Sequence, residues 1–341
     1  MRFAGWKSYF TGMTVIVLLL LVAACGNGAD PANSASGGAS PGLAEQTPES
    51  GGEAAPSAPE AEAGLRTFTA ANGTVEVPER PERIVALAPN YAGYLLALGV
   101  TPVGVPNFTL GNPYLTDKLK QAVDLGENAP TEPSIEQVLE LKPDLIVAIH
   151  VLKNLELLEK VAPIVTFEST MNNRELLLAL GTLTRREDEA KAWLQGWDEQ
   201  IAALKPEIEA AVQGRTVSVM YPSAKGIYLF RQGYGRGTEI LYGDFGLSMP
   251  EKAAQSFEEG KGFFLASLES LPELAGDIIF SAPWLGDSAG ADTVYDSPIW
   301  KNLPAVKSGY AYQVDYDIFT FSDPFSWQGQ LDIIADKLLN R

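Results

Sequence analysis

The longest regular hydrophobic pattern in the chain runs from Arg186 to Val212. Apolar residues recur there every three or four positions, which is the spacing of one face of an α-helix, and charged residues fill the other face. The apolar members are Trp193, Leu194, Trp197, Ile201, Leu204, Ile208 and Val212. Pro206 removes one backbone donor inside the pattern, and Gly214 favours an end to the helix. A helix of about 26 residues is about 39 Å long. This is too long for an ordinary crossover between strands, so the pattern predicts a spine over 186–213 that joins two lobes.

Short apolar strands alternate with amphipathic helices on both sides of this spine. Before it we expect a hairpin over 67–77, strands at 84–87, 103–105, 145–149 and 164–167, and helices at 91–98, 134–142, 154–161 and 174–183. After it we expect strands at 216–221, 226–230, 278–280 and 311–314, and helices near 237–242, 265–274, 300–306 and 327–339. Such alternation predicts parallel sheets wrapped by helices. The expected fold is therefore α/β, with two Rossmann-like lobes over 66–185 and 214–341, one long helix between them, and a ligand cleft between the lobes.

The first residues have the pattern of an export signal. Arg2 and Lys7 precede a short apolar run that ends at Ala24, and this predicts a cleaved leader over 1–24 rather than a membrane span. The stretch Val22-Ala23-Ala24-Cys25 resembles a bacterial lipobox, which implies a diacylglycerol on the sulfur of Cys25. An ordinary buried cysteine behind a leader is the alternative. Cys25 is the only cysteine, so no internal disulfide can form.

The composition of residues 26–64 predicts whether that segment folds, and the net charge of the chain restricts the kinds of partner that it can bind. Residues 26–64 are mostly Gly, Ala, Ser, Pro and Glu, which cannot bury enough apolar surface to offset the entropy of ordering. We therefore expect a disordered tether over 25–65. The formal net charge of -18 argues against nucleic acid and against electrostatic docking to anionic lipid. The lipid on Cys25 would then be the attachment to the membrane.

The residue inventory excludes several kinds of chemistry. His150 is the only histidine, so neither a Ser-His-Asp set nor a zinc or manganese site with several ligands can be argued. The glycine-rich stretch 233–237 lacks the Lys-Ser/Thr ending of a phosphate-binding loop. His150 follows the strand 145–149, at the usual binding edge of an α/β sheet. A ligand contact and a surface histidine both remain open for it.

Aromatic side chains and positive charges gather in one segment of the second lobe. Its members are Tyr228, Phe230, Arg231, Tyr234 and Arg236. Flanking glycines would let the backbone approach a ligand closely, although a glycine-rich turn with solvated arginines fits equally well. A second aromatic group is expected to lie mostly in the core: Tyr310, Tyr312, Tyr316, Phe319, Phe321, Phe325 and Trp327.

Five segments in this order resemble the ferric-siderophore-binding lipoproteins of ABC importers, and especially the ferric-hydroxamate-binding members of Gram-positive bacteria. They are Ala88-Pro89-Asn90-Tyr91-Ala92-Gly93, Lys142-Pro143-Asp144-Leu145-Ile146, Tyr234 to Tyr242, Trp300-Lys301-Asn302-Leu303 and Asp323-Pro324-Phe325. The resemblance covers nearly all of 83–341. It implies a class III periplasmic-binding-protein-like fold, no enzyme activity and no cofactor. It also implies a lipid-anchored monomer on the extracytoplasmic face of the cell membrane, with an ABC permease and its cytoplasmic ATPase as partners.

The resemblance also implies particular site residues. The siderophore supplies the oxygen ligands of its ferric iron, so no protein metal ligand is expected. Arg236 stands where the family has an arginine that donates to hydroxamate oxygens, and five fixed guanidinium donors suit such oxygens. Tyr228 and Tyr234 match aromatic pocket positions, and Tyr91 would face the cleft from the first lobe. Phe319 and Phe321 would also contact the ligand. Relatives carry tryptophans at Tyr234 and at Thr320, so fewer large rings are expected here.

Two glutamates match a different role in the family. Glu136 opens a helix of the first lobe and Glu269 lies on a helix of the second, where relatives place glutamates that pair with permease arginines. The helix dipole alone also favours a glutamate near a helix start. One well-placed arginine favours a neutral or weakly charged hydroxamate complex over a strongly anionic catecholate. The alternatives are a catecholate, haem or cobalamin receptor, an exported enzyme that uses His150, and a structural surface lipoprotein.

Overall fold

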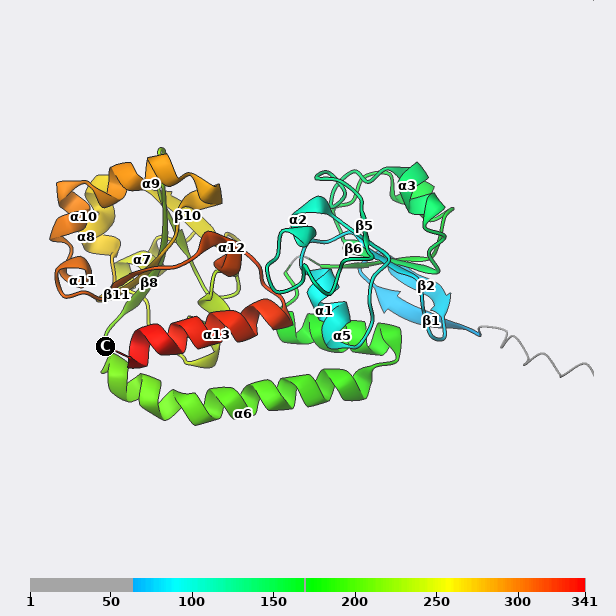
Figure 1. Ribbon diagram of the computed structural model, residues 1–341, viewed down its shortest axis with the longest axis horizontal. Coiled ribbons are helices and arrows are strands. Elements are labelled where there is room, and N and C mark those ends of the chain that lie inside the picture. The colour runs from blue at the N-terminus through cyan, green and yellow to red at the C-terminus, as the bar shows by residue number, and fades with distance from the viewer. Residues whose placement is uncertain (1–63, 169, 341) are drawn as a thin grey trace, which may run out of the picture. The chain divides into compact units, whose positions relative to one another are not determined.

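The computed structural model describes residues 64–168 and 170–340 (Figure 1). The predicted export signal, Cys25 and nearly all of the predicted tether lie outside the described residues. Within the described part, no helix combines the length and the apolar character that are needed to cross a bilayer.

The sheet before the spine has five parallel strands in the order β5-β4-β3-β6-β7. They are β3 (Ile84–Ala86), β4 (Gly104–Val105), β5 (Val123–Asp124), β6 (Leu145–Ile149) and β7 (Ile164–Phe167). Alternate strand residues face opposite ways, so Ile84 and Ala86 meet α1 (Tyr91–Ala97) and α5 (Asn173–Thr184). Val85 belongs to the core on the other face, with α3 (Ile135–Glu140) and α4 (Leu155–Leu158). The short α2 (Asn107–Leu110) follows β4.

The predicted hairpin is present beside this sheet. Strands β1 (Leu65–Ala70) and β2 (Gly73–Pro78) pair in antiparallel register, with Ala70 opposite Gly73. Hydrogen bonds hold its turn against β7: the Ala71 amide donates to Thr166 O at 2.9 Å, Asn72 Nδ2 donates to Ile164 O at 2.9 Å, and the Thr166 amide donates to Asn72 Oδ1 at 3.0 Å.

The sheet after the spine also has five strands, in the order β10-β9-β8-β11-β12. They are β8 (Val217–Ser223), β9 (Gly226–Phe230), β10 (Phe263–Ala266), β11 (Ile278–Ser281) and β12 (Ala311–Gln313). Only β9 runs against the others, so this sheet is mixed rather than parallel throughout. The expected helix over 265–274 is wrong in its first part, because Leu265 pairs with Tyr228 in β10. A short 3₁₀ helix, η2 (Leu268–Ser270), and α8 (Leu271–Leu274) follow, and their leucine spacing imitates one longer helix.

Helices cover both faces of this second sheet. One face packs through Met220 and Leu229 against a layer of short helices. These are α7 (Glu251–Gln255), α8, α9 (Ser288–Tyr295), α10 (Pro298–Asn302) and α11 (Pro304–Lys307). The other face presents Val219, Tyr221 and Phe280 to the core that includes α13 (Pro324–Leu339). The remaining short elements are η1 (Glu239–Asp244), η3 (Trp284–Gly286) and α12 (Tyr316–Phe319).

The predicted spine is the helix α6 (Glu187–Val212), which continues through Pro206. It buries Trp197, Ile201 and Ile208 along one face, as the hydrophobic spacing predicts. Gln213 and Gly214 then take left-handed backbone angles, with φ of 54° and 72°, and end it. We refer below to the described residues before α6 as the N-terminal half and to those after it as the C-terminal half.

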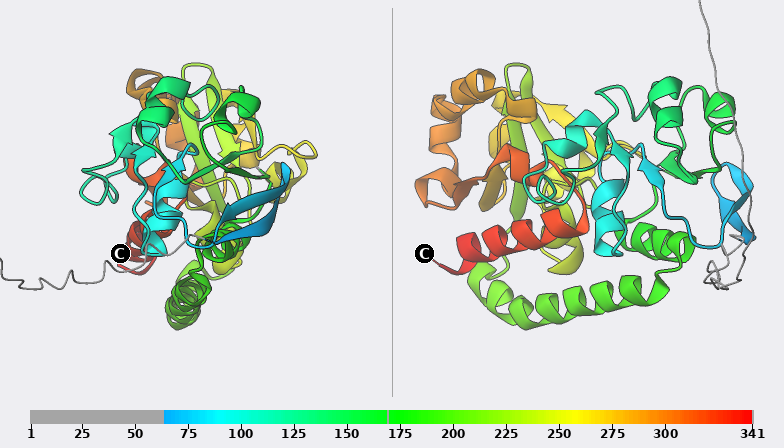
Figure 2. Two further views of the ribbon diagram at one scale, coloured as in Figure 1. Left: turned by 90° about the vertical axis from the view of Figure 1, so that its right-hand side faces the viewer. Right: turned by 45° about the vertical axis from the view of Figure 1, so that its right-hand side comes forward.

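A second helix, α13, also joins the halves. It lies alongside α6 and packs against α1 (Figures 1 and 2). The fit to α1 is close, because a Cβ on Gly93 would overlap the Asp323 carboxylate. Asp323 caps α13 by accepting from the Phe325 and Ser326 amides, so the helix begins at Pro324 rather than at the expected 327. One hydrophobic core extends from both sheets through α1, α5, α6 and α13.

Candidate functional site

The loop after β9 has an unusual backbone. Gly233, Gly235 and Gly237 have φ of 83°, 72° and 78°, and Arg236 has φ of 61°. Glycine adopts such angles freely, whereas the left-handed conformation costs a residue with a side chain about 1–2 kcal/mol. Arg236 is the one residue of this glycine-rich turn that bears that cost, which indicates that its placement is specifically maintained.

The Arg236 guanidinium lies over aromatic rings. Its central carbon is 4.3 Å from the Phe230 ring centroid, 5.0 Å from that of Trp284 and 5.7 Å from that of Tyr221. Nη1 donates to Tyr234 O at 2.9 Å. Nε is buried and has no hydrogen-bond partner, and no carboxylate lies within ion-pair distance, among the described residues. Burial lowers the pKa of Arg236.

The rings around this guanidinium form one aromatic group. Trp284 stacks on Tyr228 at a centroid distance of 4.3 Å and lies 5.7 Å from Phe230. Phe263 lies 5.7 Å from Tyr234. We call the following set the arginine cluster: Tyr221, Tyr228, Phe230, Tyr234, Arg236, Phe263 and Trp284.

Sequence reasoning missed two members of the arginine cluster. Trp284 follows β11 at the carboxyl edge of a parallel strand, which is a usual place for ligand-binding residues and could have singled it out. Phe263 lies on β10, in a stretch that the sequence pattern left unassigned before an expected helix. No local signal connects either residue with Arg236.

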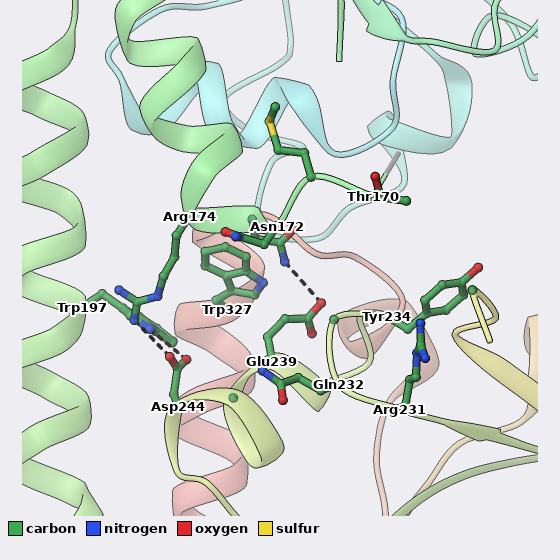
Figure 3. Close-up of a pocket in the computed structure, with 15 residues that line it drawn as sticks. Thr170, Asn172, Arg174, Trp197, Arg231, Gln232, Tyr234, Glu239, Asp244 and Trp327 are labelled. Atoms are coloured by element: carbon green, nitrogen blue, oxygen red, sulfur yellow. Dashed lines mark hydrogen bonds and ion pairs between the residues drawn. The ribbon is translucent and has the colours of Figure 1, made fainter. Parts of the chain in front are cut away.

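A cavity of about 480 Å³ lies beside the arginine cluster (Figure 3). Both halves line it: Thr170, Met171, Asn172, Asn173 and Arg174 come from the N-terminal half, and Arg231, Gln232, Gly233, Tyr234 and Glu239 are among the residues from the C-terminal half. Tyr234 is 42% exposed. The loop that carries Arg236 therefore borders the gap between the halves.

Three other predicted contact residues lie in the core. Tyr91 is 5% exposed and packs edge-on against Phe167 at 6.0 Å, so it does not line this cavity, and burial raises its pKa. Phe319 is fully buried. Phe321 is also buried, and its ring lies 4.8 Å from the exposed Phe108 of α2. The structure brings Tyr228 and Tyr234 to Arg236, whereas the tertiary packing encloses Tyr91 and Phe319.

His150 belongs to the hairpin region. Its Nδ1 lies 3.0 Å from Thr166 Oγ1, and that hydroxyl donates to Asn72 Oδ1 at 3.1 Å. Because a hydroxyl has one proton to give, the arrangement assigns the His150 Nδ1 proton to the bond with Thr166. Among the described residues, the histidine hydrogen-bonds Thr166 beside the hairpin turn and makes no hydrogen bond to the arginine cluster.

Glu136 and Glu269 are both exposed on short helices. Glu136 accepts from Ser134 Oγ at 3.0 Å near the start of α3. Glu269 lies in the 3₁₀ helix η2, rather than on the longer helix expected there, two residues after Ser267. Backbone and serine hydrogen bonds lower the pKa of both glutamates, which are therefore ionised at neutral pH. The described residues contain no group of three or more His, Cys, Asp and Glu placed to hold a metal ion.

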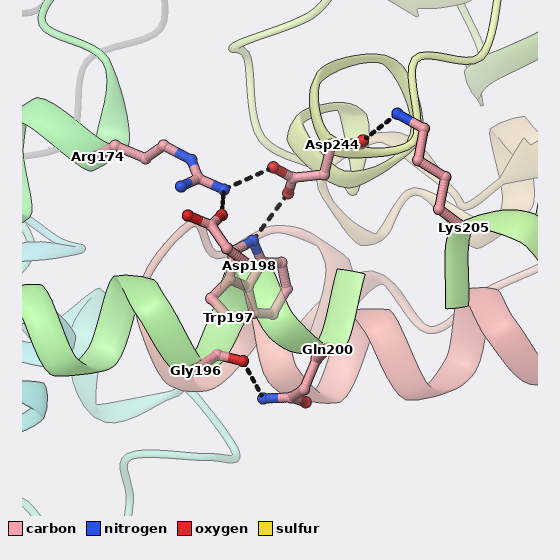
Figure 4. A network of polar contacts seen from close by, with 7 residues as sticks. All are labelled: Arg174, Gly196, Trp197, Asp198, Gln200, Lys205 and Asp244. Carbon is pink, nitrogen blue, oxygen red and sulfur yellow. Dashed lines mark hydrogen bonds and ion pairs between the residues drawn. The ribbon is translucent and has the colours of Figure 1, made fainter. Parts of the chain in front are cut away.

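Polar contacts join the halves on the spine side of the cavity. Arg174 Nη2 donates to Asp198 Oδ1 at 2.6 Å and to Asp244 Oδ1 at 3.0 Å, and Trp197 Nε1 donates to Asp244 Oδ2 at 3.0 Å (Figure 4). Elsewhere Asn112 Nδ2 donates to Asp323 Oδ2 at 2.9 Å. Burial raises the pKa of three carboxyl groups in this region, those of Glu239, Asp244 and Asp323. We call the following set the seam: Asn112, Asn173, Arg174, Asp198, Glu239, Asp244, Ser322 and Asp323.

Comparison with known proteins places this chain in a family. The profile of the periplasmic binding protein family matches residues 84–317, so the chain belongs to that family. It is 36% identical to the iron(3+)-hydroxamate-binding protein FhuD of Bacillus subtilis over 340 residues, which are 98% of each chain. It is 32% identical over 333 residues to the iron(3+)-hydroxamate-binding protein YxeB of the same organism, with 96% and 95% of the two chains covered.

Solved structures agree with this assignment. The FhuD fold-family component of a Fep/Fec-like ferrichrome ABC transporter from Bacillus subtilis has a TM-score of 0.74 and 38% identity, with 80% of this chain and 100% of that chain covered. Staphylococcus aureus FhuD2 with bound ferrioxamine B has a TM-score of 0.69 and 31% identity, with 76% and 98% covered. The predicted α/β class and the predicted family are confirmed.

Proposed function

We propose that this protein is a receptor that captures a ferric hydroxamate siderophore between its two halves and delivers it to an ABC permease. The observation that carries the proposal is Arg236, which lies over three rings with no carboxylate partner and a buried, unpartnered Nε among the described residues. A guanidinium donates well to oxygen atoms that already carry part of a negative charge, as the iron-bound oxygens of a hydroxamate do.

The iron reaches such a site already enclosed by the siderophore. The receptor then needs to recognise only the outer surface of the complex, which rings and a hydrogen-bond donor can do without any protein ligand to the metal. The two Bacillus subtilis relatives, which are iron(3+)-hydroxamate-binding proteins, and the ferrioxamine B in the Staphylococcus aureus structure support this choice of ligand.

The charges near the cavity favour hydroxamates over catecholates. Arg174 is paired with Asp198 and Asp244, so its charge is already balanced. Arg231 lines the cavity, and so does Glu239, whose charge is of the opposite sign when it is ionised. A ferric catecholate carries a strong negative charge and would need several free cations, whereas a neutral hydroxamate complex needs one well-placed donor.

A fluorescence titration tests the proposal. Trp284 lies within the arginine cluster, so a bound ferric complex should quench its emission in a saturable way. We expect tight, saturable quenching by ferrioxamine B and weak or no quenching by a ferric tris-catecholate. Tight binding of the catecholate alone would overturn the choice of ligand, and no binding of either complex would overturn the receptor function.

The proposal extends to the membrane and the permease. A lipid on Cys25 would hold a monomeric receptor at the outer face of the cell membrane, and the exposed Glu136 and Glu269 would pair with permease arginines. Replacing Cys25 with Ala should release the protein into the medium, and retention at the membrane would exclude the lipid anchor.

A double variant tests the docking role separately. Glu136→Ala with Glu269→Ala should leave siderophore affinity intact and slow uptake into cells. The matched control replaces the exposed Glu159 and Glu251, one in each half, and should transport normally. Normal uptake by the Glu136 and Glu269 double variant would exclude docking through these residues.

A further inference from the structure

Glu239 stands immediately after the loop that carries Arg236, and its carboxylate holds that loop. The Gly235 amide donates to Glu239 Oε1 at 2.7 Å, and Thr238 Oγ1 lies 3.4 Å from Oε2. Gly235 directly precedes Arg236 in the chain. A hydrogen bond at this amide therefore fixes the Tyr234–Gly235 peptide plane, which is one peptide before the arginine.

The same carboxylate also contacts the other half of the molecule. Asn173 Nδ2 donates to Glu239 Oε1 at 3.2 Å, and Ser322 Oγ donates to the same oxygen at 3.2 Å. The Ser322 amide in turn donates to Asn90 Oδ1 at 3.2 Å. Asn173 begins α5 and Asn90 precedes α1, so both asparagines belong to the N-terminal half. Figure 3 shows Glu239 projecting from η1 toward the segment that contains Asn172.

The backbone of the loop needs such an anchor. Gly235, Arg236 and Gly237 are three successive residues with left-handed angles, and a Cβ on Gly237 would lie 3.1 Å from the Phe319 ring. An arginine keeps a left-handed conformation only when its surroundings determine it strongly. The hydrogen bond from Gly235 to Glu239 constrains the Arg236 backbone from the preceding residue. The packing of Gly237 on Phe319 constrains it from the following residue.

We propose that Glu239 is a positioning residue for siderophore binding: through the Gly235 amide it sets the Arg236 guanidinium over Phe230 and Trp284, and through Asn173 it ties that placement to the N-terminal half. This inference rests on the proposed function for the identity of the ligand. The attraction between Glu239 and Arg236 acts in the same direction, since it raises the pKa of the arginine against the effect of burial.

A double-mutant cycle distinguishes positioning from general support of the fold. Glu239→Ala should weaken ferrioxamine B binding about tenfold, the effect of losing one hydrogen bond to a charged group. Glu239→Gln keeps an acceptor oxygen and should lose less than about threefold, which is at most about half of that effect on a free-energy scale. In an Arg236→Ala background, Glu239→Ala should cause no further loss. Additive losses would overturn the inference, because they would show that Glu239 acts independently of Arg236.

A readout without ligand completes the test. In the free protein, Glu239→Ala should speed amide hydrogen exchange in residues 231–238 and leave strand β8 unchanged, whereas the surface control Glu251→Ala should change neither. Unchanged exchange in the loop would overturn the inference. If wild-type protein fails to bind ferrioxamine B, the proposed function falls, and the exchange result alone decides the role of Glu239.

A second variant covers the case in which Glu239→Ala does not fold. Asn173→Ala keeps the carboxylate and removes its donor from the N-terminal half, together with the bond from Asn173 Nδ2 to Ser322 Oγ. Weaker ferrioxamine B binding by this variant, with a normal melting temperature, would support the link between the halves. Unchanged binding would overturn that link.

Discussion

Two arginines near the cavity between the halves have different surroundings: Arg174 lines the cavity, and Arg236 lies on the loop that borders it. In the seam, Arg174 donates to two carboxylates, Asp198 and Asp244. In the arginine cluster, Arg236 lies over aromatic rings, donates to one carbonyl and keeps a buried Nε without a partner among the described residues. A desolvated cation without an opposite charge is costly to maintain. The seam therefore uses its arginine for structure, whereas the arginine cluster leaves donors available for a ligand.

Removing the cluster arginine should have the largest effect on binding. Arg236→Ala should lower the affinity for ferrioxamine B by about 1.5–3 kcal/mol, the range for hydrogen bonds to charged groups. The free energy of unfolding should not fall, because the variant also removes a buried charge that has no carboxylate within ion-pair distance among the described residues. Titration and urea denaturation measure the two quantities. Unchanged affinity would show that the binding site lies elsewhere.

Removing the seam arginine should give the opposite pattern. Arg174→Ala leaves Asp244, whose side chain is 14% exposed, without its charged partner. The free energy of unfolding should fall by about 1–2 kcal/mol, at the lower end for such bonds because the arginine is 39% exposed. Urea denaturation measures this loss. An affinity loss as large as that of Arg236→Ala, with normal stability, would erase the distinction between the two arginines.

Removing the Trp284 ring should lower the affinity for ferrioxamine B less than removing the Arg236 guanidinium does. Trp284→Ala removes a stacking partner of Tyr228 and a cation–π contact of Arg236, which together are worth about 1 kcal/mol of affinity. Calorimetric titration with ferrioxamine B measures the change without relying on tryptophan emission. Trp193→Ala, in a stacked pair on the spine, is the matched control. Equal losses in both variants would argue against a local role for Trp284.

The smallest expected effect is a pH dependence that belongs to the seam. Burial raises the pKa of Asp323 above the ordinary aspartate value of about 3.9. Between that value and the raised pKa the native state binds more protons than the unfolded state, so stability falls as the pH rises through this window. Asp323→Asn should flatten this part of the melting-temperature curve and keep a cap on α13. Parallel curves for the two proteins would contradict the prediction.

The sequence allowed correct predictions for features that depend only on residues close together in the chain. The spine over 186–213 shows in the spacing of Trp197, Ile201 and Ile208, because a helix face depends only on nearby residues. Tyr228 and Arg236 could be singled out because the strand and the glycine-rich loop that bring them together are consecutive. Their role in binding stays a prediction.

Features that depend on distant residues could not be found in this way. Trp284 reaches the arginine cluster only because β11 lies beside β8 in the sheet. Leu265 follows a helical spacing, but its pairing with Tyr228 makes it part of a strand. Asn173 and Glu239 are ordinary polar residues on their own helices, and only the tertiary arrangement makes them partners. In each case the deciding contact is absent from the local pattern.

The position of α13 has a consequence for the order in which the chain folds. Asn112 and Asp323 are 211 residues apart in the sequence, yet they are hydrogen-bonded where α13 meets the N-terminal half. Closing so long a loop has an entropic cost that must be met before its contacts stabilise anything, and chains dominated by such contacts fold slowly. Gly93 and Tyr94 pack against Asp323 and Trp327, which are synthesised much later. The packing of α1 therefore cannot be completed until the last helix of the chain has been synthesised.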